Sequence, residues 1–309
     1  MKVRAWLREF RALFLLFVAL PVVLGAVAAY AYKPNGFSLP YCIISVVAMM
    51  SLHAGTVLLN DYFDYKSGTD VINMERTPYS GGSGLLPEKV LSPRQVLAAG
   101  LLCFLLSVSL GLYIVLTRSP VVLLLGMVGV VIGIFYTAPP FMLAYRGLGE
   151  IARLIVTPLM ALGGFLVQVP VASVDSTQSL ALPISTVIAA SLPVAFLNLA
   201  ALFIFEFPDF EADSAVGKKN LVVRLGTGNA VYLYILLCAL AYLSLLAGII
   251  IGLLSWSACL ALLALLLSVR SCAGLLRSHD RPKELVPSMK ASSDAYILVS
   301  IALIVSFFI

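Results

Sequence analysis

Long apolar segments separated by polar connections dominate this sequence. A helix needs about 20 predominantly apolar residues to cross a bilayer, and nine runs approach or exceed that length. They cover residues 12–32, 38–60, 95–116, 120–138, 148–169, 184–206, 230–252, 254–273 and 291–309. The pattern predicts an all-α integral membrane protein in which nine transmembrane helices surround a central cavity.

The positive charges predict the orientation. With the N-terminus in the cytoplasm, 18 of the 20 Lys and Arg residues lie on the cytoplasmic side, and only Lys33 and Arg118 face outward. The positive-inside rule expects such an asymmetry, and an even number of spans would destroy it. We therefore expect a multi-pass plasma-membrane protein with its active site facing the cytoplasm. The net charge of +5 belongs to these loops and does not indicate a nucleic-acid partner.

The composition, 61% hydrophobic and 11% charged, excludes an ordinary soluble domain. We expect one transmembrane domain over residues 1–309, with the long cytoplasmic loops 61–94, 207–229 and 274–290 capping the site. An internal repeat of four-helix units is also predicted. The second and sixth apolar segments each lead into an acidic cluster, and Phe63-Asp64-Tyr65 resembles Pro208-Asp209-Phe210.

These two acidic clusters lie at membrane boundaries, where charge is costly and marks a functional site. On a helix, His53, Thr56, Asn60 and Asp64 share one face. Asp61 points away from that face, and Asp70 returns to it only if the helix ends near Gly68. Asp209 and Asp213 are four residues apart and also share a face. If the second and sixth helices face each other, the two clusters meet.

Paired carboxylate clusters suit Mg²⁺, which prefers oxygen ligands and is often shared with substrate phosphates. Zinc would require more His and Cys ligands than the two His residues provide. The expected metal ligands are Asp64, Asp70, Asp209, Asp213 and Asp61. The alternative is that these residues are solvated charges or helix caps.

Basic residues on the same side fit recognition of a diphosphate, since Arg and Lys both bind phosphate oxygens. The expected substrate-binding residues are Asn60, Lys66, Arg76, Tyr145, Arg146, Lys218 and Lys219. The cations could instead be topology anchors. A polyprenyl diphosphate would place its charged end among these groups and its apolar tail between helices, in contact with membrane lipid.

Together these motifs resemble the UbiA superfamily of intramembrane aromatic prenyltransferases. The resemblance rests on Asn60-Asp61-x-x-Asp64 with Asp70, the Gly-rich stretch 76–84, Asp209-x-x-x-Asp213 with Gly217-Lys218-Lys219, and Tyr136-Thr137-Ala138-Pro139-Pro140. It is greatest to the menaquinone-pathway branch, which prenylates 1,4-dihydroxy-2-naphthoate. Two positions depart from the family pattern: Gly68 stands where other branches place the last aspartate, and Met142 stands where relatives often have Lys.

The resemblance implies magnesium-dependent transfer of a polyprenyl group to an aromatic acceptor, with release of diphosphate. Two Mg²⁺ ions would neutralise the leaving group, and Tyr62, Tyr136 and Tyr145 would stabilise the allylic cation. His53 and Asn60 would orient or deprotonate the acceptor. His53 could equally be a packing residue, and the tyrosines could belong to an interfacial belt.

Other functions remain compatible with the sequence. The acceptor could be 4-hydroxybenzoate, homogentisate or a glycerol-phosphate lipid. A cation-coupled transporter would also use intramembrane acids, although such sites usually lie near the midplane on broken helices. The donor chain length and the oligomeric state are not encoded in any recognisable motif.

Overall fold

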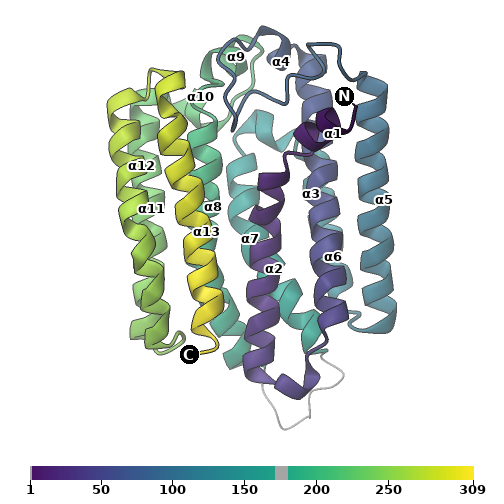
Figure 1. The fold of residues 1–309 in the computed structure, drawn as a ribbon, viewed down its shortest axis with the longest axis vertical. Helices are drawn as coiled ribbons and strands as arrows, with labels where there is room; N and C mark the ends of the chain where they lie inside the picture. Colours follow the sequence, from purple (N-terminus) through teal and green to yellow (C-terminus); the bar gives the residue numbers. More distant parts are fainter. Residues whose placement is uncertain (1, 171–179) are drawn as a thin grey trace.

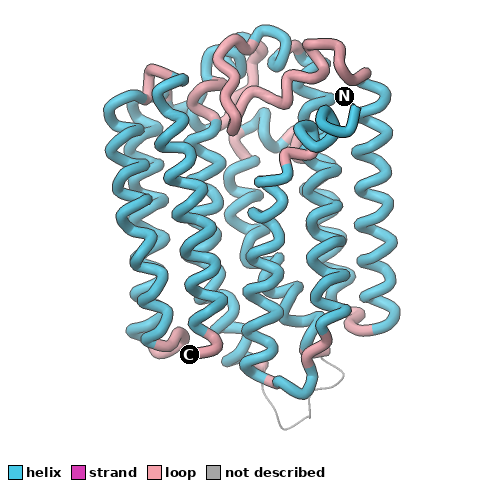
Figure 2. The backbone as a smooth tube through the Cα atoms, viewed as in Figure 1, coloured by secondary structure: helices cyan, strands magenta, loops and turns pink. Residues whose placement is uncertain are grey.

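A computed structural model describes residues 2–170 and 180–309, and these residues contain helices and loops but no strand. The helices run as a bundle along one axis, with the two chain termini at opposite ends (Figures 1 and 2). The long helices are α2 (Ala12–Tyr32), α3 (Leu39–Ser67), α5 (Pro93–Thr117), α6 (Val122–Phe135), α7 (Gly149–Gln168), α8 (Ala181–Phe205), α11 (Thr227–Ile250), α12 (Leu265–Ser278) and α13 (Val286–Ser306). Prediction and structure agree on an all-α membrane fold.

Eight helical segments in the described residues are long and apolar enough to cross a membrane. One of them joins the 3₁₀ helix Trp256–Ala264 to α12. The ninth predicted segment, 120–138, contains the shorter apolar helix Val122–Phe135 of 14 residues. The exact number of spans and the side of the membrane on which the N-terminus lies stay predictions.

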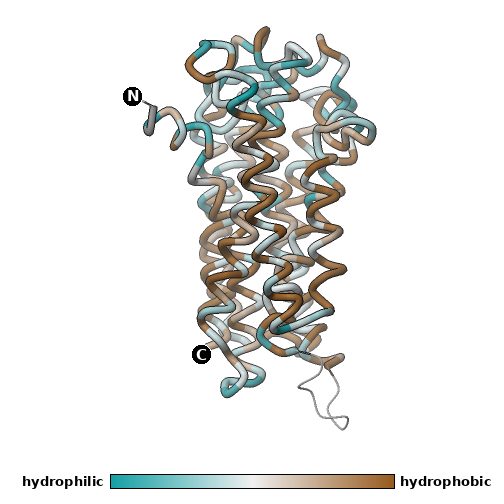
Figure 3. The backbone as a smooth tube through the Cα atoms, turned by 90° about the vertical axis from the view of Figure 1, so that its right-hand side faces the viewer, coloured by the Kyte–Doolittle hydropathy of each residue, from teal (hydrophilic) through white to brown (hydrophobic). Residues whose placement is uncertain are grey.

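Short helices cover one end of the bundle. They are α1 (Lys2–Glu9), α4 (Thr69–Ile72), α9 (Phe210–Ala215) and α10 (Leu221–Leu225), together with the 3₁₀ helices Leu143–Arg146 and Pro282–Leu285. A further 3₁₀ helix, Pro34–Gly36, lies at the other end. Hydrophilic residues concentrate in the loops, whereas the helix shafts are mainly hydrophobic (Figure 3). The loop-rich end of α3 and α8 is therefore where polar chemistry can be assembled.

Helix boundaries follow local sequence signals. Ser92 and Gln95 form a reciprocal capping box at the start of α5, with Pro93 at the first helical position. The second predicted helix continues seven residues beyond residue 60, because α3 ends only at Ser67. Gly68 then adopts φ +90°, a conformation that terminates helices. Asn60, Asp61 and Asp64 consequently lie on a helix, as their spacing required.

Helix α2 lies at the centre of the packing and contacts α3, α7, α8 and α13. One apolar core joins α8, α11 and α13 to α2, and the aromatic side chains of Tyr234 and Tyr296 are fully buried in it. Tyr296 donates a hydrogen bond to the Phe17 carbonyl oxygen at 2.8 Å and thereby links α13 to α2. The C-terminal helices therefore support the α2 wall of the site rather than contributing charged groups to it.

Candidate active site

One face of α3 carries a line of polar side chains into the bundle. His53, Thr56, Asn60 and Asp64 all line the same cavity at the loop-rich end. Asn60 Nδ2 donates to Asp64 Oδ2 at 2.9 Å, the i,i+4 contact expected on a helix. The predicted shared face is therefore present, and its outermost member is a buried carboxylate, since Asp64 is only 4% exposed.

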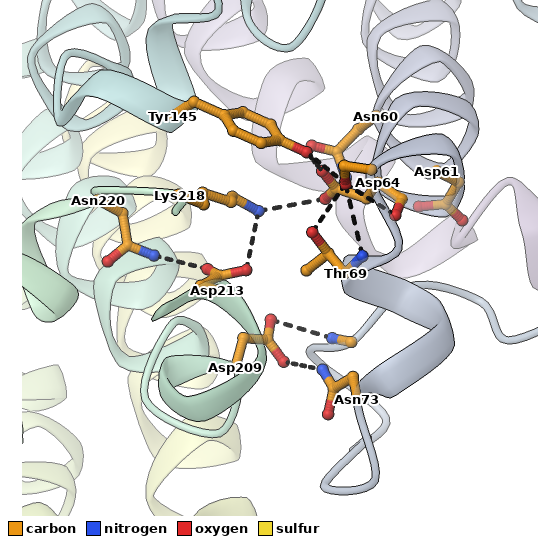
Figure 4. A network of polar contacts seen from close by, with 12 residues as sticks. Asn60, Asp61, Asp64, Thr69, Asn73, Tyr145, Asp209, Asp213, Lys218 and Asn220 are labelled. Atoms are coloured by element: carbon orange, nitrogen blue, oxygen red, sulfur yellow. Dashed lines mark hydrogen bonds and ion pairs between the residues drawn. The ribbon is translucent and has the colours of Figure 1, made fainter. Parts of the chain in front are cut away.

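The second acidic cluster lies opposite Asp64 and is joined to it by a lysine (Figure 4). Lys218 Nζ lies 3.2 Å from Asp64 Oδ2 and 3.3 Å from Asp213 Oδ1. Asp213 Oδ2 accepts a hydrogen bond from Asn220 at 2.7 Å, and Tyr145 donates to Asp64 Oδ1 at 2.7 Å. An ammonium group thus occupies the space between carboxylates that are about 150 residues apart in sequence.

The glycine-rich loop closes the third side of the cavity. Asp209 Oδ1 accepts from Asn73 Nδ2 at 2.8 Å, and Oδ2 accepts from the Gly81 amide at 3.1 Å. Gly82 approaches Asp70 so closely that a Cβ atom there would lie 2.2 Å from Asp70 Oδ2. The glycines at 81 and 82, both with positive φ, therefore let the backbone pass directly over the carboxylates.

Burial dominates the electrostatics of the carboxylates outside the membrane segments. Desolvation raises the pKa of Asp70 and of Asp209 above the usual aspartate range. It raises the pKa of Asp213 to about 7, although the Lys218 charge opposes the rise. Burial would lower the pKa of Lys218, but attraction by Asp64 and Asp213 outweighs it and raises that pKa. Burial therefore disfavours the ionised carboxylates, and a bound cation would stabilise that form.

The carboxylates of the mouth are the right chemical groups for a divalent cation, but their side chains are not close enough together to form a ligand set. No three His, Cys, Asp or Glu side chains of residues 2–170 and 180–309 converge as a ready metal-ligand set. Nevertheless Asp64, Asp70, Asp209 and Asp213 all line one cavity, and carboxylate oxygens are the ligands that Mg²⁺ prefers. Asp213 Oδ1 is buried, and its ion pair with Lys218 is its one polar contact among the described residues. The metal-ligand assignment remains a prediction, supported by this shared cavity.

The cavity continues into the membrane part of the bundle. Its outer part, the mouth, has a volume of about 140 Å³ and contains the carboxylates. A narrower neck of about 70 Å³ shares His53, Thr56, Tyr136 and Arg153 with the mouth. Beyond it lies an apolar chamber of about 460 Å³ between α3, α5, α6 and α7, which shares Met49 and Leu52 with the neck. A polar mouth is thus connected to an apolar interior.

Asp61 lies outside this cavity. It is 1% exposed; its Oδ1 accepts from Arg11 at 2.6 Å and its Oδ2 from the Ser83 amide at 3.1 Å. Arg11 itself lines the mouth. Asp61 therefore does not share the cavity lining of the other four aspartates; it pairs with the segment between α1 and α2, where it holds a guanidinium at the edge of the mouth.

Several predicted cations also lie away from the mouth lining. Lys66 is exposed and lies 5.1 Å above the Tyr62 ring, and Lys219 is exposed. Arg146 is exposed and donates to the Pro140 carbonyl oxygen. Arg76 donates to the backbone carbonyl oxygen of Asp70 and so supports the glycine-rich loop. Among the predicted cations of the two motifs, Lys218 alone lines the described cavity.

The structure adds residues that the motifs did not indicate. Arg11, Arg153, Asn73 and Glu206 line the mouth beside the predicted residues. Arg153 carried a signal in the sequence, since a charge inside an apolar run of spanning length is rarely incidental. Nothing in the sequence indicated a functional role for Arg11, because cations commonly flank a membrane span.

Comparison with known proteins agrees with this architecture. The sequence model of the UbiA prenyltransferase family matches residues 18–293. The chain is 26% identical over 293 residues to a 1,4-dihydroxy-2-naphthoate octaprenyltransferase of Bacillus subtilis, covering 93% of this chain and 88% of that protein. It is 27% identical over 285 residues to a 2-carboxy-1,4-naphthoquinone phytyltransferase of Synechocystis, covering 91% and 85%.

Solved structures share the fold. A UbiA homologue from Aeropyrum pernix superposes with a TM-score of 0.67 at 20% identity, over 94% of this chain and 97% of that one. A UbiA homologue from Archaeoglobus fulgidus bound to GPP and Mg²⁺ superposes with a TM-score of 0.60 at 17% identity, over 97% and 99%. The family match extends over most of the chain and includes both acidic clusters. The chain is therefore a prenyltransferase that belongs to the UbiA prenyltransferase family.

Proposed function

We propose that the protein transfers a polyprenyl group from an allylic polyprenyl diphosphate to 1,4-dihydroxy-2-naphthoate, with Mg²⁺ as cofactor and diphosphate as the leaving group. The observation that carries the proposal is the continuity of the carboxylate-lined mouth, the neck and the apolar chamber. A lipid diphosphate requires both environments on one path. A charged ligand without an apolar tail would not occupy the apolar chamber.

The mouth supplies groups suited to the diphosphate end. Asp64, Asp70, Asp209 and Asp213 would hold two Mg²⁺ ions, and Lys218 and Arg11 would contact phosphate oxygens as they leave. When bound, Mg²⁺ would supply positive charge that stabilises the charge developing on the diphosphate. Tyr145 would keep Asp64 in position through its 2.7 Å hydrogen bond. The metal-bound homologues from Archaeoglobus fulgidus support this reading.

The chamber supplies the environment for the tail. Residues from α3, α5, α6 and α7 line it, and nearly all of them are apolar. A prenyl tail leaving the mouth would pass His53, Thr56 and Tyr136 in the neck before it reaches the chamber. Tyr136, which lines both the neck and the mouth, would present its ring to the allylic carbon, where a cation would develop. The enclosing loops would exclude water, which would otherwise quench that cation.

The bond changes are those of electrophilic substitution. The allylic C1–O bond breaks and diphosphate takes the electron pair. A ring carbon of the acceptor then forms a bond to C1. That carbon restores aromaticity by losing its substituent, which is a proton or, where it carries the carboxylate, carbon dioxide. His53 and Asn60 line the path and are candidates to orient the acceptor hydroxyl or receive a proton.

The acceptor is proposed from the relatives. The protein from Bacillus subtilis and a second one from Haemophilus influenzae, 25% identical over 308 residues, are both named as acting on 1,4-dihydroxy-2-naphthoate. We propose that the mouth opens to the cytoplasm of a cell whose plasma membrane holds the protein, because the loops at the mouth carry most of the Lys and Arg residues.

The test is an in vitro reaction with the full chain in liposomes. Labelled geranylgeranyl diphosphate and Mg²⁺ are incubated separately with 1,4-dihydroxy-2-naphthoate, 4-hydroxybenzoate, homogentisate and a glycerol-phosphate lipid. We expect a prenylated product with the naphthoate and none after chelation of Mg²⁺. Product with another acceptor alone would reassign the substrate. No product with any acceptor, together with cation-driven uptake into the liposomes, would replace the enzyme by a transporter.

A further inference from the structure

Arg153 is a cation without a carboxylate partner inside the bundle. It lies in the second turn of α7, within an apolar helix of spanning length. No Asp or Glu oxygen of the described residues lies within ion-pair distance of it; its only side-chain hydrogen bond goes to Asn198 Oδ1, at 3.3 Å. A charge in such a position is costly and rarely retained without a task. An anionic guest would supply the missing partner.

The guanidinium is held by a small buried network. Asn198, which is 1% exposed, donates from Nδ2 to Thr157 Oγ1 at 3.1 Å. Thr157 is fully buried, and its hydroxyl donates to the Arg153 carbonyl oxygen at 3.1 Å. Asn198 Nδ2 also donates to the Phe17 carbonyl oxygen of α2 at 3.5 Å, so α7 and α2 together set the amide orientation and present its Oδ1 to the guanidinium. The network orients the charge without neutralising it.

Arg153 faces both the mouth and the neck, and aromatic rings line the same mouth. Phe14, Phe205 and Tyr79 form a continuous series, with ring centroids 5.6 Å apart for Phe14 and Phe205 and 5.2 Å apart for Tyr79 and Phe205. They come from α2, α8 and the glycine-rich loop, whereas Asp64 belongs to α3. A flat apolar ring therefore has a surface to pack on, beside the route that the prenyl tail would take.

His53 supplies an independent indication of a polar guest. Its Nε2 atom is buried without a hydrogen-bond partner, and the side chain lines the mouth and the neck together with Arg153. Buried polar atoms without partners are rare in folded proteins. A guest that carries an anionic group for Arg153 and a hydroxyl for His53 would satisfy both.

We propose that Arg153, positioned by Asn198 and Thr157, recognises the carboxylate of an aromatic hydroxy acid whose ring packs against Phe14 and Phe205. The inference rests on the proposed function and deepens it, since it assigns the acceptor to one side of the mouth and the donor diphosphate to the other. Arg153 is the residue that distinguishes an acidic aromatic acceptor from a neutral one. The carboxylate is what the unpaired guanidinium selects.

The test measures equilibrium binding rather than turnover. The probes are 1-hydroxy-2-naphthoate and the matched neutral compound 1-naphthol, with the full chain in lipid nanodiscs. We expect Arg153→Met to weaken binding of the acid about tenfold to hundredfold, the range for a lost charge-assisted hydrogen bond. Binding of 1-naphthol and of geranylgeranyl diphosphate with Mg²⁺ should stay unchanged. Arg153→Lys keeps the charge but loses the planar guanidinium, so its affinity for the acid should lie between that of the unsubstituted protein and that of Arg153→Met.

Arg94→Gln is the matched control, because Arg94 is an exposed arginine in the first turn of α5, away from the mouth lining. Equal loss of acid and naphthol binding in Arg153→Met, or loss of donor binding instead, would overturn the proposal. Failure of the proposed reaction is a separate result. If no acceptor is prenylated but binding of the acid still depends on Arg153, the proposed reaction is wrong and the acceptor subsite stands. If prenylated product forms but Arg153→Met still prefers the acid to 1-naphthol, the proposed reaction stands and the Arg153 subsite is wrong.

Discussion

Lys218 offers the sharpest test of the carboxylate site. Its side chain is 12% exposed, and Nζ lies 3.2 Å from Asp64 Oδ2 and 3.3 Å from Asp213 Oδ1. Lys218→Met keeps most of the side-chain volume and removes the ammonium. Two buried carboxylates would then face each other with no cation between them. We expect the variant to be less stable without metal and to recover when Mg²⁺ is added.

The magnitude follows from the geometry. At an effective dielectric constant of about 20, a unit charge pair at these distances attracts by about 5 kcal/mol before desolvation is subtracted. Removing one partner of a buried pair costs about 3–5 kcal/mol in net stability. Mg²⁺ at about 100 times its dissociation constant would return about 2.7 kcal/mol. Most of the loss would therefore be recovered by the metal.

The assay is thermal unfolding of both proteins in nanodiscs, with chelator and with Mg²⁺. The expected result is a Tm lowered by roughly 5–15 °C in chelator and largely restored by Mg²⁺. Lys219→Met is the stability control, because the neighbouring Lys219 is exposed and makes no ion pair in the described residues. Equal Tm values for Lys218→Met with and without Mg²⁺ would refute the view that these carboxylates form a cation site.

Three further outcomes follow from individual positions. Asp209→Asn should lower kcat/KM at least about 100-fold because it removes a carboxylate charge from the mouth lining. Glu211→Gln, at an exposed position, should leave kcat/KM unchanged. Equal kcat/KM values for Asp209→Asn and the unsubstituted protein in a turnover assay would exclude a metal role for Asp209. Burial raises the pKa of Glu9 from 4.5 to about 7. Ionisation of Glu9 therefore destabilises the folded state, with the full effect above about pH 7 and none below about pH 4.5. Glu9→Gln should raise Tm at about pH 8 but not at about pH 4, as measured by differential scanning calorimetry. Gly126 lines the apolar chamber, and a Cβ atom there would meet no atom within 4 Å. Gly126→Phe should therefore disfavour long donors about tenfold to hundredfold relative to geranyl diphosphate in competition assays. An unchanged ratio would show that the tail does not enter the chamber.

Local patterns were sufficient to predict the membrane class and part of the site. Spanning length and hydropathy identify the helices, because backbone polar groups in a bilayer must be satisfied within each segment. The spacing of His53, Thr56, Asn60 and Asp64 placed them on one face, and the structure puts all four in one cavity. Gly68 ended the helix near the position its sequence suggested, since a residue with positive φ stops α-helical hydrogen bonding.

Contacts between distant segments could be decided only by the tertiary structure. Asp61 and Asp64 are the same residue type on one helix, yet Asp61 pairs with Arg11 and Asp64 with Lys218. Positions three residues apart on a helix point about 60° apart, and here that difference directs the two carboxylates toward different elements. The sequence shows Arg153 only as a charge inside an apolar run, whereas the packing of α7 against α8 presents that charge to a cavity. The sequence thus determines which segments enter the membrane and which faces carry polar groups, since hydropathy and helical periodicity are local. Which charges meet, and which is left without a partner, depends on how those helices pack.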